Sequence, residues 1–303
     1  MKVIFTCGGT AGHVNPALAL AGYMRKKDPT VEVLFVGTPE GIERDLVAQA
    51  GYDYRGIAVG SLERSVSWEA IRHNCKSAWE MLALRRKTGA IFKEFPADLV
   101  VGTGGYASYP MVKYAALRGI PTAVHEANMI PGLTTKMLEK HASRIMVGFE
   151  ECRALYKHPE RIAVTGTPVR GDFFDLTHEE AKAALGMGKD EPLVVSFWGS
   201  LGASTMNGQM LDFFKKEKED GYPFYHIHAV GGRGWETMQQ EMQKAGLPGS
   251  HKLDVRKYIY DMAVVMRAAD LVICRAGAST LSELEAAGRA SVLIPSPNVA
   301  ENH

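Results

Sequence analysis

Four short glycine-rich stretches, each after an apolar run, are the parts of the sequence best suited to bind a ligand that carries phosphate. The first, CGGTAGHVNPALALA (7–21), places glycines, a threonine and a histidine before a run with helical spacing. Glycine lets the backbone approach a ligand closely, and a helix N-terminus offers N–H groups with partial positive charge. We interpret this stretch as a cradle for a diphosphate or sugar phosphate, with a tight turn that binds nothing as the alternative. It has neither the dinucleotide G-x-G-x-x-G spacing nor the G-K-[ST] of a P-loop.

The same arrangement recurs three times, which favours a ligand site over coincidence. The further stretches are VGTGGYASYP (101–110), FWGSLGAS (197–204) and CRAGASTLSE (274–283). Hydroxyl groups of Ser200, Ser204 and Thr205 can donate hydrogen bonds to phosphate oxygens. Glu283 falls about one turn inside the helix expected after the fourth stretch, where a carboxylate can accept hydrogen bonds from ribose hydroxyls. The alternative for Glu283 is a solvated residue on a helix surface.

Three further sites could supply acid–base chemistry or positive charge. His13 ends the first glycine stretch, and an imidazole at the carboxyl end of a strand suits a general base, although a lone histidine is more often structural. The stretch VHEANMIPG carries His125, Glu126 and Asn128 after another apolar run. Arg170 follows TGTPV and could reach a diphosphate with its guanidinium group.

These residues need a scaffold that gathers strand ends, and the apolar pattern predicts one. Short apolar runs alternate with segments of helical spacing, which is typical of parallel sheets covered on both faces. The expected strands are 3–7, 31–37, 98–102, 121–125, 144–149, 192–199, 222–232, 269–277 and 290–296. The expected helices are 16–27, 41–51, 211–218, 235–246 and 279–288. Asn15 is the expected cap of the first helix and Pro16 its first residue.

The strand and helix pattern restarts after VTGTPVRGD (164–172), and the length of 303 residues suits about two domains. We therefore predict an α/β protein with two Rossmann-like, doubly wound domains, covering residues 1–165 and 166–303. Ligands of such sheets bind at the carboxyl ends of strands where the strand order reverses. The cleft between the two domains is the expected site.

The composition narrows the class of protein. The chain is 46% hydrophobic and 23% charged with a formal net charge of +1, so no global field points to nucleic acid. Its four cysteines are far apart and show neither metal-ligand nor redox spacing, which fits a reducing cytoplasm. No signal-peptide core and no apolar run of about 18 residues is found. We expect a cytosolic protein that is able to lie on a membrane surface.

One segment, SWEAIRHNCKSAWEMLALRRK (67–87), combines aromatic and basic residues. Its apolar residues recur at helical spacing among basic ones, so an ordinary core-facing helix is one interpretation. Tryptophan among lysine and arginine also suits an anionic membrane interface, and a lipid-linked substrate would favour that interpretation. The residues expected to dock are Trp68, Ile71, Arg72, Trp79, Leu82, Arg85 and Arg86.

In this order, GGTAGHVNPALALA, VGTGGYASYP, HEANMIPGL, TGTPVR, GSLGAS and RAGASTLSELEAAGRASVLIPSPNVAENH resemble the MurG family, in the style of its Gram-positive branch. These N-acetylglucosaminyltransferases convert lipid I to lipid II in peptidoglycan synthesis. The resemblance implies a GT-B fold, with an N-terminal domain for the lipid-linked acceptor and a C-terminal domain for UDP-N-acetylglucosamine. It also implies peripheral attachment at the cytoplasmic face of the membrane, and partners among cell-wall synthesis and division proteins.

The resemblance further implies which residues bind substrate. Donor contacts are implied for Thr10, Ala11, Gly12, Asn128, Arg170, Ser200, Ile259, Ala278, Ser279, Thr280, Leu281, Ser282 and Glu283. Gly104, Gly105 and Tyr106 complete the expected substrate-binding set. Glu283 would hold the ribose hydroxyls, the Ile259 backbone would read the uracil edge, and Arg170 and Ser200 would meet the diphosphate.

The implied reaction is one displacement at the anomeric carbon with inversion, in which the acceptor 4-hydroxyl attacks and UDP leaves. His13 is the expected general base and Glu126 the second candidate. No cofactor is expected, and the lack of a D-x-D motif favours a metal-independent reaction. Ala11, Ala127, Thr167 and Trp198 depart from the usual family residues. Family members also continue past the position of His303, so we expect this sequence to lack a C-terminal segment.

Three alternatives remain open. One is another GT-B enzyme, such as a UDP-sugar epimerase, which would act on the donor alone. A second is a nucleotide-sugar-binding protein that is inactive because the C-terminal segment is missing. The third, an NAD-dependent dehydrogenase, is disfavoured by the glycine spacing.

Overall fold

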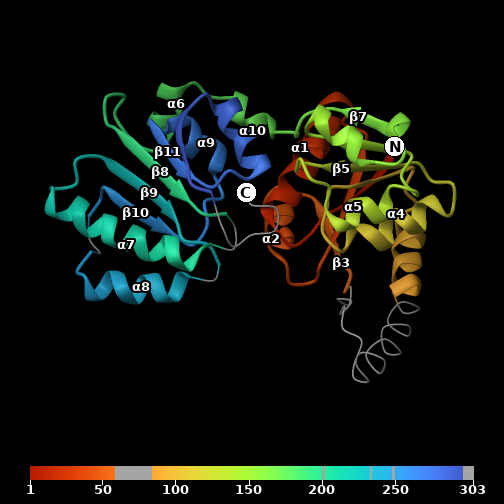
Figure 1. Ribbon diagram of the computed structural model, residues 1–303, viewed down its shortest axis with the longest axis horizontal. Helices are drawn as coiled ribbons and strands as arrows, with labels where there is room; N and C mark the ends of the chain where they lie inside the picture. The colour runs from red at the N-terminus through yellow and green to blue at the C-terminus, as the bar shows by residue number, and fades with distance from the viewer. Residues whose placement is uncertain (59–83, 200–201, 233, 248–249, 296–303) are drawn as a thin grey trace, which may run out of the picture. The chain divides into compact units, whose positions relative to one another are not determined.

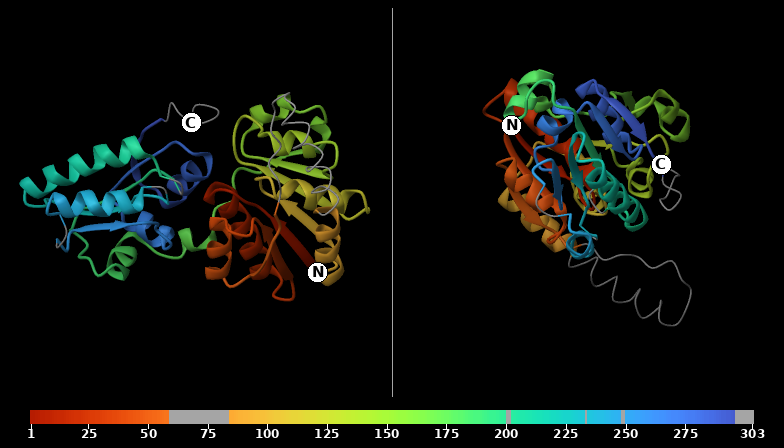
Figure 2. Two further views of the ribbon diagram at one scale, coloured as in Figure 1. Left: turned by 90° about the horizontal axis from the view of Figure 1, so that it is seen from below. Right: turned by 90° about the vertical axis from the view of Figure 1, so that its left-hand side faces the viewer.

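The computed structural model describes residues 1–58, 84–199, 202–232, 234–247 and 250–295. The chain divides into two compact units, Met1–Arg170 and Gly171–His303. Each unit is an α/β domain built on one parallel sheet (Figures 1 and 2), which confirms the predicted fold class of two doubly wound domains.

The first unit contains a seven-stranded parallel sheet in the order β3-β2-β1-β4-β5-β6-β7. Its strands are β1 (Lys2–Thr6), β2 (Glu32–Gly37), β3 (Asp53–Gly56), β4 (Leu99–Gly102), β5 (Thr122–Glu126), β6 (Arg144–Val147) and β7 (Ile162–Val164). Phe5 of β1 lies opposite Phe35 of β2 on one side and Val101 of β4 on the other. The strand order therefore reverses between β1 and β4, and a switch point lies where these two strands end.

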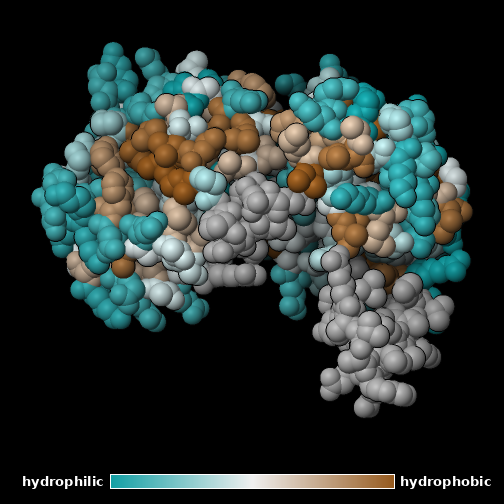
Figure 3. All heavy atoms as spheres, in the orientation of Figure 1, coloured by the Kyte–Doolittle hydropathy of each residue, from teal (hydrophilic) through white to brown (hydrophobic). Residues whose placement is uncertain are grey.

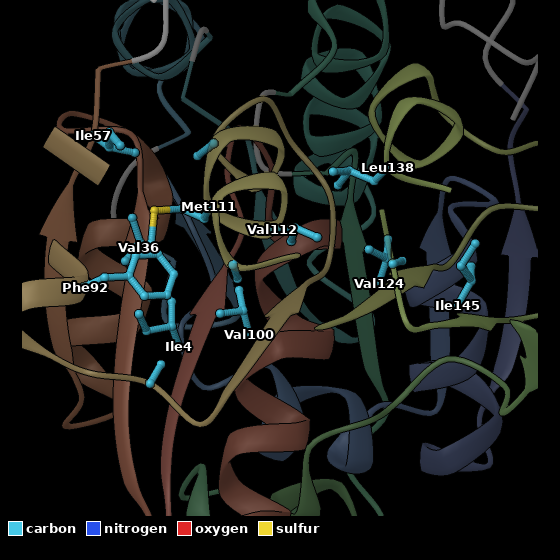
Figure 4. Close-up of a cluster of buried hydrophobic side chains, with 14 of the residues drawn as sticks. Ile4, Val36, Ile57, Phe92, Val100, Met111, Val112, Val124, Leu138 and Ile145 are labelled. Carbon is cyan, nitrogen blue, oxygen red and sulfur yellow. The ribbon is translucent and has the colours of Figure 1, made fainter. Parts of the chain in front are cut away.

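Helices connect the strands of this sheet and supply the rest of its core. They are α1 (Ala11–Lys27), α2 (Ile42–Gln49), residues 84–94, α4 (Ser108–Ala116) and α5 (Leu133–Leu138), with short 3-10 helices at Glu150–Leu155 and Pro159–Arg161. A large buried cluster joins Ile4, Val100 and Val124 of the strands to Met111 of α4 and Leu138 of α5 (Figure 4). Each such side chain contributes about 1.5–3 kcal/mol when it is fully buried, so this layer fixes where the strand ends lie.

The second unit contains a five-stranded parallel sheet in the order β10-β9-β8-β11-β12. Its strands are β8 (Leu193–Phe197), β9 (Tyr225–Ala229), β10 (Leu253–Arg256), β11 (Leu271–Cys274) and β12 (Ala290–Leu293). The order reverses between β8 and β11, so this sheet has its own switch point.

Five α-helices and one 3-10 helix accompany the second sheet in the described residues. They are a 3-10 helix at Gly171–Phe174, α6 (His178–Ala184), α7 (Ser204–Glu219), α8 (Trp235–Lys244), α9 (Met262–Ala268) and α10 (Ala278–Ala287). A capping box between Thr177 and Glu180 begins α6, and Gly288, with a φ of 64°, ends α10 in the left-handed conformation. Trp198, Met210, Phe214 and neighbouring side chains form the core beneath α7 and α8.

One helix start differs from the prediction. The first helix was expected to begin at Pro16 with Asn15 as its cap, but α1 begins at Ala11 with Thr10 in the capping position, and Pro16 lies inside the helix. Backbone N–H groups of His13 and Val14 donate to the Thr10 carbonyl and close the first turn. Pro16 is the sixth residue of α1 and has no N–H, so the helix forms there without the usual hydrogen bond to the carbonyl four residues earlier.

Other differences concern short or polar elements. The strands β3, β7 and β10 were not predicted, because sequences such as DYRG and LDVR lack an apolar run. The helices α4, α5, α6 and α9 were also not predicted, and α7 begins at Ser204 rather than at residue 211.

The surface of each unit combines polar residues with separate apolar patches (Figure 3). Among the described residues, no helix is both long enough and apolar enough to cross a membrane.

Candidate active site

The loops after β1 and β4 meet at the switch point of the first sheet. Gly104 and Gly105 have φ values of 116° and 80°, in the region that favours glycine. A Cβ at Gly104 would overlap the ring of His13, and a Cβ at Gly105 would overlap the Gly8 carbonyl. The hydroxyl of Thr103 also donates to the backbone carbonyl of His13 at 2.6 Å. The structure therefore brings together the first two glycine stretches and the predicted base.

The hydrogen bonds of His13 define which ring nitrogen carries the proton. Nδ1 lies 2.9 Å from the carbonyl oxygen of Gly8 and 3.4 Å from the hydroxyl of Thr10. A carbonyl can only accept, so Nδ1 must donate. In the neutral ring Nε2 then holds the lone pair, which is the form that a general base requires. His13 is half-buried in the first turn of α1.

Tyr106 and Asn128 lie in loops at this end of the sheet. Tyr106 directly follows Gly105 and is 68% exposed. Asn128 is half-buried in the loop between β5 and α5, close to the exposed Met129 and Ile130. Both predicted residues are thus placed where an external ligand can reach the loops that carry them.

Glu126, the second candidate base, is buried and engaged in holding its own loop. One carboxylate oxygen accepts from the Asn128 N–H at 3.1 Å. The other accepts from the Gly132 N–H at 2.9 Å and from the Thr135 hydroxyl at 2.7 Å. The Cys152 thiol donates to the Met129 carbonyl of the same loop at 3.2 Å. This geometry favours His13 over Glu126 as the group that meets an incoming hydroxyl.

His125 lies beneath the same region and is nearly inaccessible to solvent. Its Nε2 lies 3.3 Å from the carbonyl of Gly166, and Nδ1 has no hydrogen-bond partner among the described residues. Burial lowers the pKa of His125, and the hydrogen bond to the Gly166 carbonyl and the nearby carboxylate of Glu126 offset this only in part. His125 is therefore a neutral side chain that links β5 to the segment leading to Arg170, which is itself half-buried.

In the second unit, α7 and α10 begin just after β8 and β11, on the two sides of the switch point. Gly202 has a φ of 76°, and a Cβ there would overlap the carbonyl of Val230 after β9. The amide of Asn207 in α7 donates to that carbonyl at 3.1 Å. The loops after β8 and β9 are thus packed closely together, with the Trp198 side chain buried among them.

The turn into α10 carries six of the thirteen predicted donor contacts. Gly277 occupies the capping position, and its carbonyl accepts from the Leu281 N–H at 2.9 Å. Glu283 is only 7% exposed, so the alternative of a solvated surface residue is wrong. Burial, and next the charge of Glu283, raise the pKa of the Cys274 thiol to about 12. Glu283 therefore places its carboxyl group close to Cys274, at the carboxyl end of β11.

Other predicted residues are distributed around these turns. Ala278, Ser279, Thr280, Leu281 and Ser282 are half-buried in the first turns of α10. Ile259 is buried between β10 and α9, and its side chain belongs to the core rather than to the surface. Thr10, Ala11 and Gly12 are half-buried where α1 begins. Ser200 lies outside the described residues, as do Trp68, Ile71, Arg72, Trp79 and Leu82.

Sequence reasoning missed a buried polar chain in the second sheet. Glu217 of α7 lies 2.6 Å from Nδ1 of His226, whose Nε2 lies 2.7 Å from the Ser196 hydroxyl. That hydroxyl lies 2.6 Å from Nδ1 of His228. All four side chains are almost fully buried, so the chain is structural despite its likeness to a hydrolase triad. Alternating histidines in YHIHA were the sequence signal for it.

Sequence reasoning also missed Glu43, which is completely buried at the start of α2. Its carboxylate accepts from the N–H and hydroxyl of Thr38 at 2.8 and 2.6 Å, and from the Gly9 N–H at 3.3 Å. It thus reaches the first glycine stretch from 34 residues away. Within the described ranges, no group of three or more His, Cys, Asp or Glu side chains is arranged to hold a metal ion.

Known proteins match both units. The glycosyltransferase family 28 N-terminal domain matches residues 3–147, and the glycosyltransferase family 28 C-terminal domain matches residues 193–303. A relative from Acetivibrio thermocellus is 42% identical over 303 residues, which are 100% of this chain and 80% of its own. It is named UDP-N-acetylglucosamine--N-acetylmuramyl-(pentapeptide) pyrophosphoryl-undecaprenol N-acetylglucosamine transferase. A relative from Thermoanaerobacter sp. carries the same name and is 38% identical, over 100% of this chain and 81% of its own.

Solved structures agree with this assignment. The crystal structure of Acinetobacter baumannii MurG matches with a TM-score of 0.60 at 25% identity, over 100% of this chain and 80% of that one. A UDP-GlcNAc 2-epimerase from Neisseria meningitidis matches with a TM-score of 0.62 at 12% identity, over 97% and 82% of the two chains. The epimerase shows a shared fold alone, whereas the transferase relatives match in sequence as well. The chain therefore belongs to glycosyltransferase family 28 and, within it, to the MurG family.

Proposed function

We propose that the protein is an inverting hexosyltransferase that moves N-acetylglucosamine from UDP-N-acetylglucosamine to the 4-hydroxyl of lipid-linked N-acetylmuramoyl-peptide. This reaction converts lipid I to lipid II in peptidoglycan synthesis. The observation that carries the proposal is the hydrogen bond from Nδ1 of His13 to the Gly8 carbonyl, which leaves the lone pair of the neutral ring on Nε2. This ring lies at the switch point of the first sheet, in a chain 42% identical to a named transferase of this kind. The proposed domain roles are acceptor binding and membrane docking for residues 1–165 and donor binding for residues 166–303.

The donor nucleotide is assigned to the second unit. The N-termini of α7 and α10 flank its switch point, and such termini attract phosphate through their N–H groups and partial positive charge. The buried carboxylate of Glu283, in the second turn of α10, is suited to accept hydrogen bonds from the ribose hydroxyls. The Ile259 backbone is the proposed contact for the uracil edge, with its buried side chain as the anchor.

The acceptor and the base are assigned to the first unit. The acceptor 4-hydroxyl gives its proton to Nε2 of His13 as its oxygen bonds to the anomeric carbon, and the bond from that carbon to the UDP oxygen breaks. UDP leaves with the electron pair of that bond. Because the hydroxyl attacks from the face opposite UDP, the configuration at the anomeric carbon inverts. Gly104, Gly105, Tyr106 and Asn128 are proposed to shape the acceptor site around this ring. Glu126 acts by holding the loop of Asn128, through the hydrogen bonds described above.

The negative charge that develops on the leaving diphosphate needs compensation. Arg170 and Ser200 are proposed to supply it together with the two helix N-termini of the second unit. No cofactor or metal ion is part of this proposal, and nucleic acid is not a proposed partner.

The enzyme is proposed to work at the cytoplasmic face of the membrane, because a lipid-linked acceptor remains in the bilayer. Of the predicted docking residues, Arg85 and Arg86 are exposed near the start of the described helix 84–94. The exposed apolar side chains Met129, Ile130 and Leu133 offer a further lipid-facing patch in the loop before α5 and at its first residue. Vesicles with anionic lipid should bind the wild type, and Arg85→Glu with Arg86→Glu should weaken that binding. Unchanged binding would remove these arginines from the docking surface.

The proposal is tested by measuring UDP release from UDP-N-acetylglucosamine with and without a lipid I analogue. Release that depends on the acceptor, with a disaccharide product, is the expected result. Conversion of the donor without acceptor would instead indicate an epimerase, and UDP binding without release would indicate a nucleotide-sugar-binding protein. The chain spans 80% of the length of the relative from A. thermocellus. If UDP binds without release, the same assay on a chain extended to that length decides between a transferase that needs the further residues and a binding protein. Cell-wall synthesis and division proteins are proposed partners for pull-down experiments.

A further inference from the structure

Glu43 and His13 contact opposite ends of a single peptide group. The N–H of Gly9 donates to Oε2 of Glu43 at 3.3 Å, and the carbonyl of Gly8 accepts from Nδ1 of His13 at 2.9 Å. These N–H and C=O groups belong to the same peptide bond, which is planar and conjugated, so polarisation at one end is felt at the other.

The surroundings of Glu43 are built to admit its carboxylate. A Cβ at Gly41 would overlap the carboxylate, a Cβ at Gly8 would lie 2.9 Å from Oε1, and a Cβ at Gly37 would lie 2.8 Å from Cγ. Three glycines therefore leave the space that this buried side chain fills. Such a close fit holds the carboxylate at the base of the first glycine stretch.

The partners of Glu43 are all donors. Thr38 supplies a backbone N–H and a hydroxyl to Oε1, and Gly9 supplies its N–H to Oε2. This pattern is the one that an ionised carboxylate requires. Burial, and next the negative charge of Glu43, raise the pKa values of Cys7 and Tyr54, so both groups stay protonated beside this carboxylate.

We propose that Glu43 is a positioning residue for His13, acting through the Gly8–Gly9 peptide group. The carboxylate draws on the N–H, the carbonyl of the same peptide becomes a stronger acceptor, and the Nδ1–H of His13 is held toward it. The arrangement corresponds to the carboxylate–histidine pairs of other enzymes, with a peptide bond inserted between the partners. This inference rests on the proposed role of His13 as the base, because the position of the ring matters for turnover only if Nε2 takes the proton of the acceptor hydroxyl.

Other titratable groups also face this pair. His125 on β5 lies near His13, and Cys7, directly after β1, and Tyr54 on β3 lie near Glu43. Because burial keeps His125 neutral and raises the pKa of both Cys7 and Tyr54, Glu43 is the group that holds charge beside the Gly8–Gly9 peptide.

The test is Glu43→Gln, read out on His13 itself by the nitrogen-15 resonances of its ring across a pH titration without substrate. The wild type should show protonated Nδ1 and bare Nε2. In Glu43→Gln the ring proton should be held less firmly on Nδ1, so the share of molecules that carry it on Nε2 should rise about threefold. Turnover should fall about tenfold, with little change in KM for UDP-N-acetylglucosamine.

Two matched variants separate this effect from general damage. Thr38→Val removes one hydrogen bond to the same carboxylate but keeps the bond to Gly9, and Glu139→Gln alters another buried carboxylate that accepts from the backbone N–H of His158. Both should leave the ring proton of His13 distributed between Nδ1 and Nε2 as in the wild type. If Glu43→Gln fails to fold, Glu43→Asp keeps the charge but shortens the reach to Gly9, and should give a smaller shift in the same direction.

The outcomes distinguish this inference from the proposed function. A folded Glu43→Gln or Glu43→Asp in which the ring proton of His13 is distributed as in the wild type overturns the inference, whatever the turnover. If the shift is seen while wild-type protein transfers no sugar, the link between Glu43 and His13 stands and the proposed function fails.

Discussion

The ring of His13 lies against Gly104 with no room for a side chain between them. Gly104→Ala should therefore push the ring away from its place at the strand ends, and should also strain the backbone, because φ is 116°. Displacement of a catalytic group by about 1 Å can lower turnover about 100-fold. We expect a loss of that order in kcat, measured in the UDP-release assay.

The control for this prediction is Gly119→Ala. Gly119 also has a positive φ, of 73°, but a Cβ there would meet no atom within 4 Å. This variant should share the backbone strain and keep its turnover. Equal losses of turnover in the two variants would mean that strain, and not contact with His13, is responsible.

His13→Asn should separate catalysis from binding. The asparagine amide can still donate to the Gly8 carbonyl, whereas the basic Nε2 is removed. We expect kcat to fall about 10²–10⁴-fold, which is the usual contribution of a general base. The Kd of UDP, measured by calorimetry, should not change, and a matching loss of UDP affinity would argue for a binding role instead.

Glu126→Ala should act mainly on stability. It leaves the Asn128 and Gly132 N–H groups and the Thr135 hydroxyl without their acceptor. Each donor that stays buried without an acceptor lowers the free energy of unfolding by about 1–3 kcal/mol. We expect a clear drop in the midpoint of thermal unfolding. Glu150→Ala, which breaks a surface pair with Arg153, should leave the midpoint unchanged. A fully stable Glu126→Ala with abolished turnover would restore Glu126 as a candidate base.

Glu283→Gln should weaken nucleotide binding. A hydrogen bond to a charged group contributes about 1.5–3 kcal/mol, so the Kd for UDP should rise about 10- to 100-fold. The variant should also lose most of the wild-type preference for UDP over its 2′,3′-dideoxy analogue. Glu285→Gln, on the exposed side of the same helix, should bind both as the wild type does. Equal weakening of UDP and the analogue would show that Glu283 does not contact the ribose.

His228 should make stability depend on pH. Burial, with the nearby His226, lowers its pKa from 6.5 to about 3, so it stays neutral in the folded protein while the unfolded chain binds a proton. Its contribution to stability is therefore complete above about pH 6.5 and is lost as pH falls toward about 3. The free energy of unfolding should lose up to about 1.4 kcal/mol per pH unit from this one proton.

Urea unfolding at several pH values between about 6 and 4.5 checks this expectation, because the unfolded His228 is protonated there and the folded one is not. In His228→Asn the slope of stability against pH should be smaller by about one proton. His251→Asn, at an exposed position, should keep the wild-type slope. A wild-type slope in His228→Asn would contradict the assignment.

The elements that could be predicted from sequence are those whose signals are local. Glycine turns after apolar runs, such as GGTAGH and VGTGGY, correctly indicated where β1 and β4 end, because the turn and the strand are adjacent in the chain. The predicted start of α1 was wrong, since Asn15 and Pro16 form a good local capping signal that competes with the one at Thr10. The turn closed by the Thr10 carbonyl prevails.

The parts of the site that were missed depend on distant contacts. No residue near Glu43 in the sequence predicts that its carboxylate accepts from the Gly9 N–H, because the two residues are 34 positions apart with α1 and β2 between them. The burial of Glu283 was equally hidden, since the polar Ser282 and Glu285 lie close to it in the sequence of α10. Glu126 was predicted for its chemistry, but only the packed loop reveals which donors surround it.

The link between Glu43 and His13 through the Gly8–Gly9 peptide group also decides what kind of mutation can reveal it. Because the two side chains are joined by the main chain, a scan that truncates side chains one at a time finds no intermediate residue between them. An amide-to-ester replacement at Gly9, made by chemical ligation or by incorporating glycolic acid, substitutes an oxygen for the N–H and keeps every side chain. The backbone N–H of Gly9 can thus be tested separately by changing the main chain, whereas a change of side chain cannot remove it.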